Sequence, residues 1–355
     1  MSYCAGWKHK GSIYLLADTV AAVSIPPNRR QLSLGELLTA YREEPVEEVS
    51  LKLHCIAPGT VVACTGDSEQ AMKVIEFLRG EQGGSASNAE LLARLESRIV
   101  PFSADSADSA DSAVALLVVS SGSDGHAELL RWTAAEGLDQ SGSDFFEIGS
   151  KTPYHEALSP ELRAILASGD LTSDRVLPVL TAIVQSRGAR DCTIDMNVEG
   201  LIFGLRTEGG TVTWQEDTLV VLYDQAFASS THVCALARDD ELVVHSSDND
   251  LTRVFASPAS MLRCRSRDAA WLRRIKAELA SDRFRYRVFI STSEKVITVI
   301  VRNDFERESR YLRLQAQSNG QFDLALSPEL TSLLLRPLLD RSQGAIPFQL
   351  SVRED

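Results

Sequence analysis

The sequence predicts an α+β protein with two domains, one covering residues 1–225 and a smaller one covering residues 226–355. The first observation is the order of its elements: strands, a helix pair, strands, a second helix pair and strands, after which the pattern restarts. Two sheets with helices on their outer faces satisfy this order. The second observation is charge. Residues 226–355 hold 19 Lys and Arg against 17 Asp and Glu, a net of +2, so the remainder of the −13 chain carries −15.

Two hairpins are expected near the start of the first domain. Residues 2–7 and 12–17 are rich in apolar and aromatic side chains and predict strands around a turn at Lys10-Gly11. The stretch SLKLHCIAPGTVVACTGD, residues 50–67, predicts a strand, a Pro-Gly turn and a second strand.

A helix with apolar residues at helical spacing is expected over residues 67–80, with Gly80 as its C-cap. The remaining elements of the first domain continue the alternation. Helices are expected over 33–44, 88–99, 159–170 and 173–189, and strands over 113–121, 126–135, 143–150, 191–209 and 211–223. The acidic triplet repeat SADSADSADSA at 103–113 is expected to be a mobile loop.

The second domain repeats the alternation on a smaller scale. Hairpins are expected over 231–247 and 284–303, each followed or preceded by a helix, at 268–280 and 327–340. In the segment RFRYRVF, alternation places the arginines on one strand face and the aromatic residues on the other, as in a half-buried strand.

The composition points away from several classes of protein. The six cysteines form no CxxC pair and the six histidines are scattered, so no metal site is expected and the thiols are expected to be reduced and mostly buried. Neither a Rossmann nor a P-loop glycine pattern occurs, so no nucleotide cofactor is expected. The chain shows no secretion signal and no apolar run of membrane-spanning length, so a cytoplasmic location is expected.

The opening residues carry a more specific signal. The chain begins MSYC, and Gly11 and Asp18 follow Ser2 at hairpin spacing. This arrangement resembles the proteasome β-subunit and its bacterial relatives, the HslV peptidase and the ancestral β-subunit proteins, with Asp18 at the essential aspartate. The resemblance covers residues 2 to about 225. It implies an N-terminal nucleophile hydrolase with a four-layer αββα sandwich, joined here to an additional domain.

The same resemblance assigns roles to further positions. It aligns Lys52 with the catalytic lysine and Gly66 with the oxyanion-hole glycine of the family. FFEIGS resembles the family's IGSG motif and points to Ser150. RDCTID retains the aspartate of the family's late Asp-x-x-Ser-Gly-Gly motif as Asp191, although Ile194 stands where that motif has serine.

These residues suit acyl transfer. If Met1 is removed, which a small second residue generally permits, the α-amine of Ser2 can take the proton of its own hydroxyl. The reference pKa of that amine is about 7.7–8.0, and the positive charge of Lys52 would lower it further. Asp18 would hold Lys52, and Ser150 and Asp191 would hold the amine. The expected reaction is hydrolysis of a peptide or amide bond through a Ser2 acyl-enzyme.

Alternatives stay open at this stage. Each residue has an ordinary structural reading, and Cys4 could act as nucleophile only after removal of three residues. A catalytically inactive scaffold is the second hypothesis, supported by Ile194 and the added domain. The basic stretch 263–287, with nine basic and three acidic residues, could bind nucleic acid, but contact with the acidic first domain or another protein is the favoured interpretation. The resemblance also implies a homo-oligomeric ring and an unfoldase partner.

Overall fold

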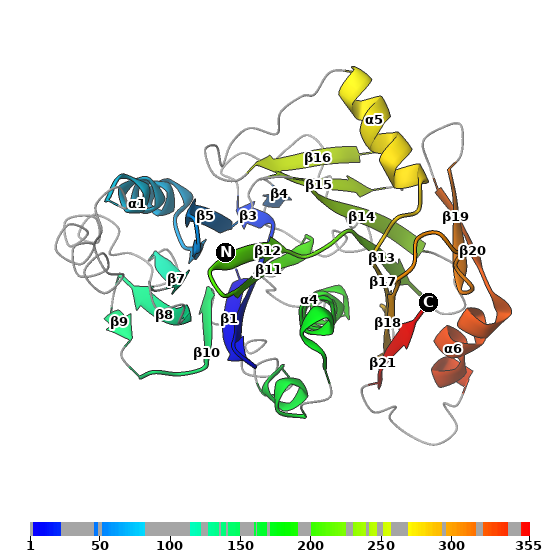
Figure 1. Ribbon diagram of the computed structural model, residues 1–355, viewed down its shortest axis with the longest axis horizontal. Coiled ribbons are helices and arrows are strands. Elements are labelled where there is room, and N and C mark those ends of the chain that lie inside the picture. Colours follow the sequence, from blue (N-terminus) through cyan, green and yellow to red (C-terminus); the bar gives the residue numbers. More distant parts are fainter. Residues whose placement is uncertain are drawn as a thin grey trace.

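The computed structural model describes helices and strands between Tyr3 and Asp355 (Figure 1). The described residues are 3–22, 46–48, 52–81, 114–121, 127–134, 136–139, 141–149, 160, 162–168, 171–190, 200–224, 230–238, 241–246, 251–256, 269–292, 296–316, 322–339 and 349–355. Within these ranges, helices combine with sheets that are largely antiparallel. The helices expected over 33–44 and 88–99 and the repeat at 103–113 lie outside them.

The first sheet grows from the N-terminal hairpin that the sequence predicts. Lys10 (φ 50°) and Gly11 (φ 80°) form its two-residue turn, and this left-handed backbone matches the twist of the flanking strands. The sheet contains, in spatial order, β10 (Phe145–Gly149), β1 (Tyr3–His9), β2 (Ser12–Asp18), β11 (Ile202–Glu208) and β12 (Thr211–Trp214).

The second sheet grows from the predicted second hairpin. Pro58 and Gly59 form its turn, with Gly59 at φ 74°. The sheet contains, in spatial order, β5 (Leu53–Ala57), β6 (Thr60–Thr65), β7 (Ala115–Ser121), β8 (Ala127–Thr133) and β9 (Gly137–Asp139). A separate two-stranded ladder pairs β3 (Val20–Ala22) with β4 (Val46–Glu48).

These two sheets pack face to face, and helix α1 (Ser68–Glu81) covers the outer face of the second (Figure 1). Strand β6 shows how alternation produces both contacts. Val61 and Ala63 point into the core between the sheets, whereas Val62 and Cys64 point into the core beneath α1. Gly80 lies inside α1 rather than after it, so the C-cap prediction was wrong: the helix continues to Glu81.

Helix α4 (Ser173–Arg190) covers the other face of the first sheet. It comes closest to the sheet at Gly204 of β11. A Cβ atom there would lie 2.6 Å from a methyl carbon of Leu177 and 2.7 Å from the backbone oxygen of Leu15. The absence of a side chain at Gly204 therefore sets how closely the helix approaches the sheet.

A third sheet packs on the opposite side of α4. Its seven strands are, in spatial order, β16 (Leu251–Ala256), β15 (Glu241–Ser246), β14 (Ser230–Arg238), β13 (Thr218–Tyr223), β17 (Tyr286–Ser291), β18 (Val296–Val301) and β21 (Gln349–Glu354). Pro178 illustrates the fit with α4. A proline has no N–H for the Asp174 carbonyl four residues earlier, and the hydroxyl of Tyr286 in β17 donates to that oxygen over 2.7 Å.

Strand β13 links the two halves of the chain. Sequence analysis places it in the first domain, yet it pairs with β14 and β17 of the third sheet. The expected boundary after residue 225 thus falls between two hydrogen-bonded neighbours, and the change of sheet lies at residues 215–217, between β12 and β13. Whether the two parts fold as separate domains stays a prediction.

The third sheet is covered on both faces. On the face away from α4 lie α5 (Ala269–Ala280), α6 (Pro328–Leu339) and the hairpin of β19 (Leu312–Ala316) and β20 (Phe322–Leu326). The prediction of a half-buried β17 with aromatic residues on one face was therefore wrong. Tyr286 faces α4, while Phe289 and the fully buried Arg287 belong to the other face, because cover on both sides removes the polar face.

Candidate active site

The open ends of the two predicted hairpins lie together. Each hairpin turns tightly at its far end, so the start of β1 lies beside the end of β2, and the start of β5 beside the end of β6. Because β1 and β2 pack on β5 and β6, all four of these ends meet between the two sheets. Asp18, Lys52 and Gly66 each lie at one of them.

Asp18 and Lys52 form a buried ion pair between the sheets. Nζ of Lys52 lies 2.5 Å from Oδ1 of Asp18, and the two side chains are 5% and 0% exposed. The same Oδ1 accepts the backbone N–H of Tyr3 over 3.0 Å. One carboxylate therefore holds both the lysine of one sheet and the first described residue of β1 in the other.

The surroundings of Asp18 affect the pKa of its carboxyl group. Burial raises the pKa of Asp18 above its ordinary value, while the Lys52 ammonium and the Tyr3 amide act in the opposite direction. Oδ2 of Asp18 is also buried, and no hydrogen-bond donor reaches it from the residues that the structure describes. The carboxylate thus has an acceptor position left over after it has bound Lys52.

At the same place, one backbone bond extends the β5–β6 hairpin, and one side-chain contact links the two sheets. The Cys64 amide donates to the Lys52 carbonyl over 3.0 Å, and the Cys4 thiol lies 3.6 Å from the Cys64 carbonyl oxygen. Burial raises the pKa of the Cys4 thiol well above its ordinary value. Cys4 therefore lacks the exposed, thiolate-forming setting of a reactive cysteine.

Gly66 lies between the end of β6 and the start of α1. Its φ of 101° is a backbone conformation that residues with side chains rarely adopt, which explains the glycine. Asp67 is the N-cap, because its carboxylate accepts the Gln70 amide over 2.9 Å. Gly66 is thus one residue ahead of the cap, directly before the N-terminus of α1, whose first residue is Ser68.

Three predicted site residues lie outside the described residues: Ser2, Ser150 and Asp191. Each adjoins a described residue in the chain. Ser2 precedes Tyr3, Ser150 follows Gly149, and Asp191 follows Arg190 at the end of α4. Tyr3 and Gly149 are direct partners in the β1–β10 ladder. The backbone next to Ser2 and the backbone next to Ser150 are therefore neighbours.

Sequence analysis missed two side chains that hold the region around Asp18. Oγ1 of Thr19 accepts the Leu201 amide over 3.1 Å, and Gln185 of α4 bonds to the backbone of Gly200 and Ile202. Thr19 carries no pattern that distinguishes it. Gln185 does, because it directly follows the run VLPVLTAIV, whose one polar residue is Thr181, in a helix that is covered on two sides.

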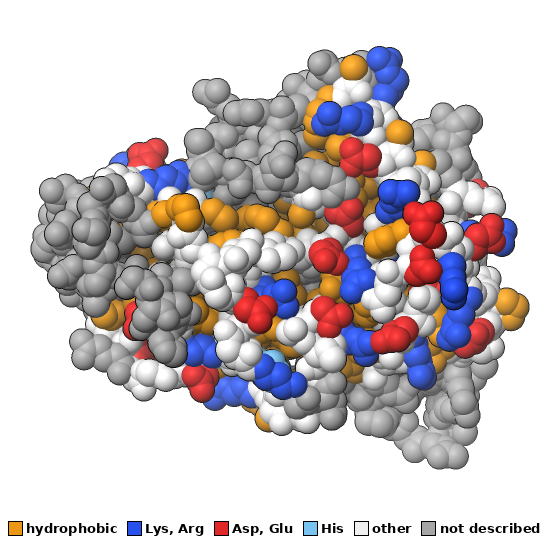
Figure 2. Space-filling model, viewed as in Figure 1, with side chains coloured by type: hydrophobic (Ala, Val, Ile, Leu, Met, Phe, Trp, Pro, Cys, Tyr) orange, Lys and Arg blue, Asp and Glu red, His pale blue; other side chains and the backbone are white. Residues whose placement is uncertain are grey.

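Among the described arginines of the basic stretch 263–287, some pair with carboxylates of the first part of the chain and others are exposed on α5. Arg285 lies 3.2 Å from Glu216 and 3.8 Å from Asp174, both in the acidic first part of the chain. Arg273 and Arg274 of α5 are exposed. In Figure 2, positive side chains lie over α5, whereas positive and negative side chains are interspersed over the rest of the C-terminal sheet.

Metal-binding groups and membrane-spanning helices are both absent from the described residues. In the parts of the chain with assigned positions, no group of three or more His, Cys, Asp and Glu is arranged to hold a metal ion. Among the helices described there, none is long and apolar enough to cross a membrane. A comparison with known protein families and with curated protein sequences gave no match to this chain.

Proposed function

We propose that the protein is an N-terminal-serine peptidase or amidohydrolase that cleaves its substrate through a Ser2 acyl-enzyme. The observation that carries the proposal is the buried Asp18–Lys52 pair, whose shared oxygen also accepts the Tyr3 amide. Tyr3 is joined to Ser2 by a single peptide bond. A lysine buried at this point of the chain has a chemical use, because its charge lies next to a potential nucleophile.

The proposed mechanism uses Ser2 twice. After removal of Met1, the neutral α-amine accepts the hydroxyl proton as Oγ attacks the substrate carbonyl carbon. The amine then returns the proton to the leaving nitrogen, and water releases the acyl group by the same proton transfers in reverse order. The Lys52 ammonium favours the neutral form of the amine, and Asp18 keeps Lys52 in place.

Gly66 is the proposed donor to the oxyanion. Its backbone follows the end of β6, at the same end of the hairpins as Lys52. An amide at such a point needs no reorganisation when negative charge develops on the substrate oxygen. Asp67 directly follows it and is exposed, so solvent screens the effect of this carboxylate on the oxyanion.

The register of β1 and β10 supports a role for Ser150. Tyr3 pairs with Gly149, Cys4 with Ile148 and Ala5 with Glu147. An antiparallel ladder extended by one position would bring residue 2 opposite residue 150. Asp191, directly after α4, is the proposed second partner of the amine. The layer order of α1, two sheets and α4 also agrees with the four-layer sandwich that the resemblance implies.

The test is an intact-mass measurement of the untagged protein before and after treatment with a serine-reactive epoxyketone or acylating probe. We expect loss of the Met1 mass, one probe adduct mapped to Ser2, and no adduct in Ser2→Ala. Lys52→Met should abolish detectable adduct formation, a rate at least about a hundredfold below that of the wild type, since the amine then stays protonated.

Lys10→Met is the matched control for Lys52→Met. Lys10 lies in the N-terminal hairpin that carries Asp18, but its Nζ donates to the Leu171 carbonyl, away from Asp18. Its replacement should leave the labelling rate unchanged. A wild-type protein that keeps Met1 and forms no adduct would overturn the proposal and favour the scaffold hypothesis, with the C-terminal part as a binding region.

A further inference from the structure

The first residues of β11 lie where the sheet lacks a strand. β12 pairs with β11 only over Leu205–Glu208, whereas Ile202 lies opposite Asp18 on the other neighbour, β2. On the β12 side of Ile202, the described part of the chain offers no further strand. A buried carbonyl and amide at such a gap cost free energy unless another group bonds to them.

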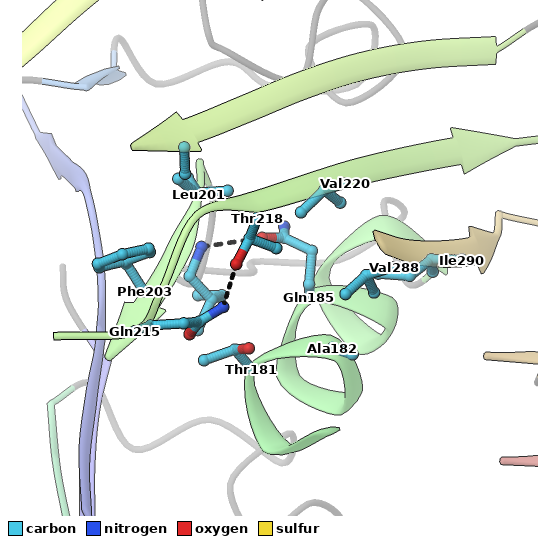
Figure 3. Close-up of a pocket in the computed structure, with 12 residues that line it drawn as sticks. Thr181, Ala182, Gln185, Leu201, Phe203, Gln215, Thr218, Val220, Val288 and Ile290 are labelled. Carbon is cyan, nitrogen blue, oxygen red and sulfur yellow. Dashed lines mark hydrogen bonds between the residues drawn. The ribbon is translucent and has the colours of Figure 1, made fainter. Parts of the chain in front are cut away.

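Gln185 of α4 fills this gap (Figure 3). Its Nε2 donates to the Gly200 carbonyl over 2.9 Å, and its Oε1 accepts the Ile202 amide over 2.8 Å. One carboxamide thus supplies both the donor and the acceptor that a neighbouring strand would supply. Gln185 is 3% exposed, so water does not replace these bonds readily.

Thr19 holds the same backbone from the β2 side. Its Oγ1 accepts the Leu201 amide over 3.1 Å, and the residue directly follows Asp18. The backbone of residues 200–202 is therefore bonded by a helix side chain on one side and by β2 on the other. Ile202, the partner of Asp18 in the ladder, lies between these two attachments.

Side-chain packing by itself does not hold the start of β11 in place. A cavity of about 10 Å³ lies beside Gln185, and Thr181, Gln215 and Thr218 also line it (Figure 3). Its volume is enough for about one water molecule. Because side chains do not fill all of the space, the hydrogen bonds of Gln185 add to the packing that holds the start of β11 against α4.

We propose that Gln185 is a positioning residue for the candidate active site. It fixes the start of β11, and β11 in turn holds the end of β2 so that Asp18 keeps its oxygen on Lys52 and on the Tyr3 amide. The consequence for catalysis rests on the proposed function, since Asp18 and Tyr3 locate Ser2 in that mechanism. The consequence for the geometry, which is the position of Asp18, does not rest on the proposed function.

The first experiment compares two buried glutamines that line the same cavity. Gln185→Leu removes both bonds to β11, while Gln215→Leu removes a bond to Thr218 from a residue that is 4% exposed. For labelling of Ser2 by the epoxyketone, we expect Gln185→Leu to lower the maximal rate, kinact, by about a hundredfold without changing KI. Gln215→Leu should lose less thermal stability, because it removes one bond together with an Oε1 that has no partner among the described residues, and it should label at nearly the wild-type rate.

Gln185→Glu refines the test through its pH dependence. The carboxylate still accepts the Ile202 amide, but only its protonated form can donate to Gly200. Its labelling rate relative to wild type should therefore rise as the pH is lowered towards the pKa of the glutamate. If Gln185 only stabilised the fold, the ratio of the labelling rates of Gln185→Glu and the wild type would follow thermal stability instead.

Hydrogen exchange of the Tyr3 amide tests the geometry without any reaction. This amide donates to Asp18, so Gln185→Leu should accelerate its exchange while Gln215→Leu leaves it slow. Unchanged exchange and unchanged labelling in Gln185→Leu would overturn the inference. If the wild type forms no adduct at all, the proposed function fails, and the exchange rate of Tyr3 alone decides whether Gln185 positions Asp18.

Discussion

Two of the ion pairs buried in the described part of the chain are built differently. Between the first two sheets, Lys52 contacts Asp18 through one nitrogen and one oxygen. In the third sheet, the fully buried Arg287 lies 2.7 Å from Asp355 and 2.9 Å from Asp282, using a different nitrogen for each. A guanidinium stays charged in proteins and binds through a planar fork, whereas an ammonium is a single charge whose pKa responds to burial.

The carboxylates differ as well. Asp355 uses both oxygens: Oδ2 binds Arg287 and Ser309, and Oδ1 accepts the Arg310 amide over 2.9 Å. Asp18 uses only Oδ1 among the residues that the structure describes. The Arg287 cluster therefore has the form of a structural crosslink between β17, β21 and the chain before β19. The Asp18–Lys52 pair leaves one buried carboxylate oxygen without a partner among the described residues.

The largest effects are expected when one partner of each pair is removed. Lys52→Met leaves the buried Asp18 without its cation, and Arg287→Met does the same to Asp355. We expect each to lower the free energy of unfolding by about 3–5 kcal/mol in denaturant titrations. Only Lys52→Met should also abolish labelling of Ser2 in the folded fraction. Loss of labelling in both variants at equal stability would contradict the distinction between them.

Removing both partners sharpens the comparison. Asp18→Asn combined with Lys52→Met leaves no buried charge in the pair, so most of the lost stability should return while labelling stays absent. Asp282→Asn combined with Arg287→Met should recover little, because the Asp355 carboxylate stays buried and unpaired. Denaturant titrations of the wild type, the four single variants and the two double variants give both coupling energies.

His54 provides a third case, a buried ionisable group without an ion partner. Burial, with the Arg79 charge nearby, lowers its pKa from 6.5 to about 4, and neither ring nitrogen has a partner within the described ranges. The unfolded chain takes up a proton below pH 6.5, whereas the folded chain does so only near pH 4. This group therefore adds stability that is fully present above pH 6.5 and is lost as the pH falls to 4.

The size of this loss is about 3 kcal/mol. His54→Met should remove it, so the difference in stability between variant and wild type should grow in favour of the variant from pH 7 to pH 4. At pH 7 the variant should be at least as stable, because two buried unpaired nitrogens are removed. Parallel stability curves for the two proteins across this range would show that His54 does not titrate as described.

The smallest expected effect concerns two glycines at the two ends of α1. Gly66→Ala forces a side chain onto a φ of 101° and should cost about 1–3 kcal/mol. Gly80→Ala places a better helix former inside α1, where a Cβ atom meets nothing within 4 Å, and should add about 0.5–1 kcal/mol. Thermal unfolding of both variants measures the two changes in stability. Equal shifts of the same sign would contradict the explanation by backbone conformation.

Local chemistry in the sequence predicts much of the fold. Lys10-Gly11 and Pro58-Gly59 mark the two turns, and helical spacing marks α1, α4, α5 and α6. Strands β3, β4, β9, β16, β19, β20 and β21 were missed. Strand β13 was placed with the wrong neighbours, since an apolar strand carries no mark of the sheet that it joins. The resemblance brought Asp18 and Lys52 together before the structure did, but it offered no reason to consider Thr19 or Gln185.

The sequence by itself determined where the chain turns, which faces of its helices are apolar and which residues could carry chemistry, because turn geometry and side-chain periodicity act over a few neighbouring residues. Tertiary structure alone decided that the Asp18 oxygen on Lys52 also accepts the Tyr3 amide, and that Gln185 bonds to the backbone of Gly200 and Ile202. These contacts join residues from different layers. Their distances depend on how two sheets and a helix stack, which no local pattern specifies.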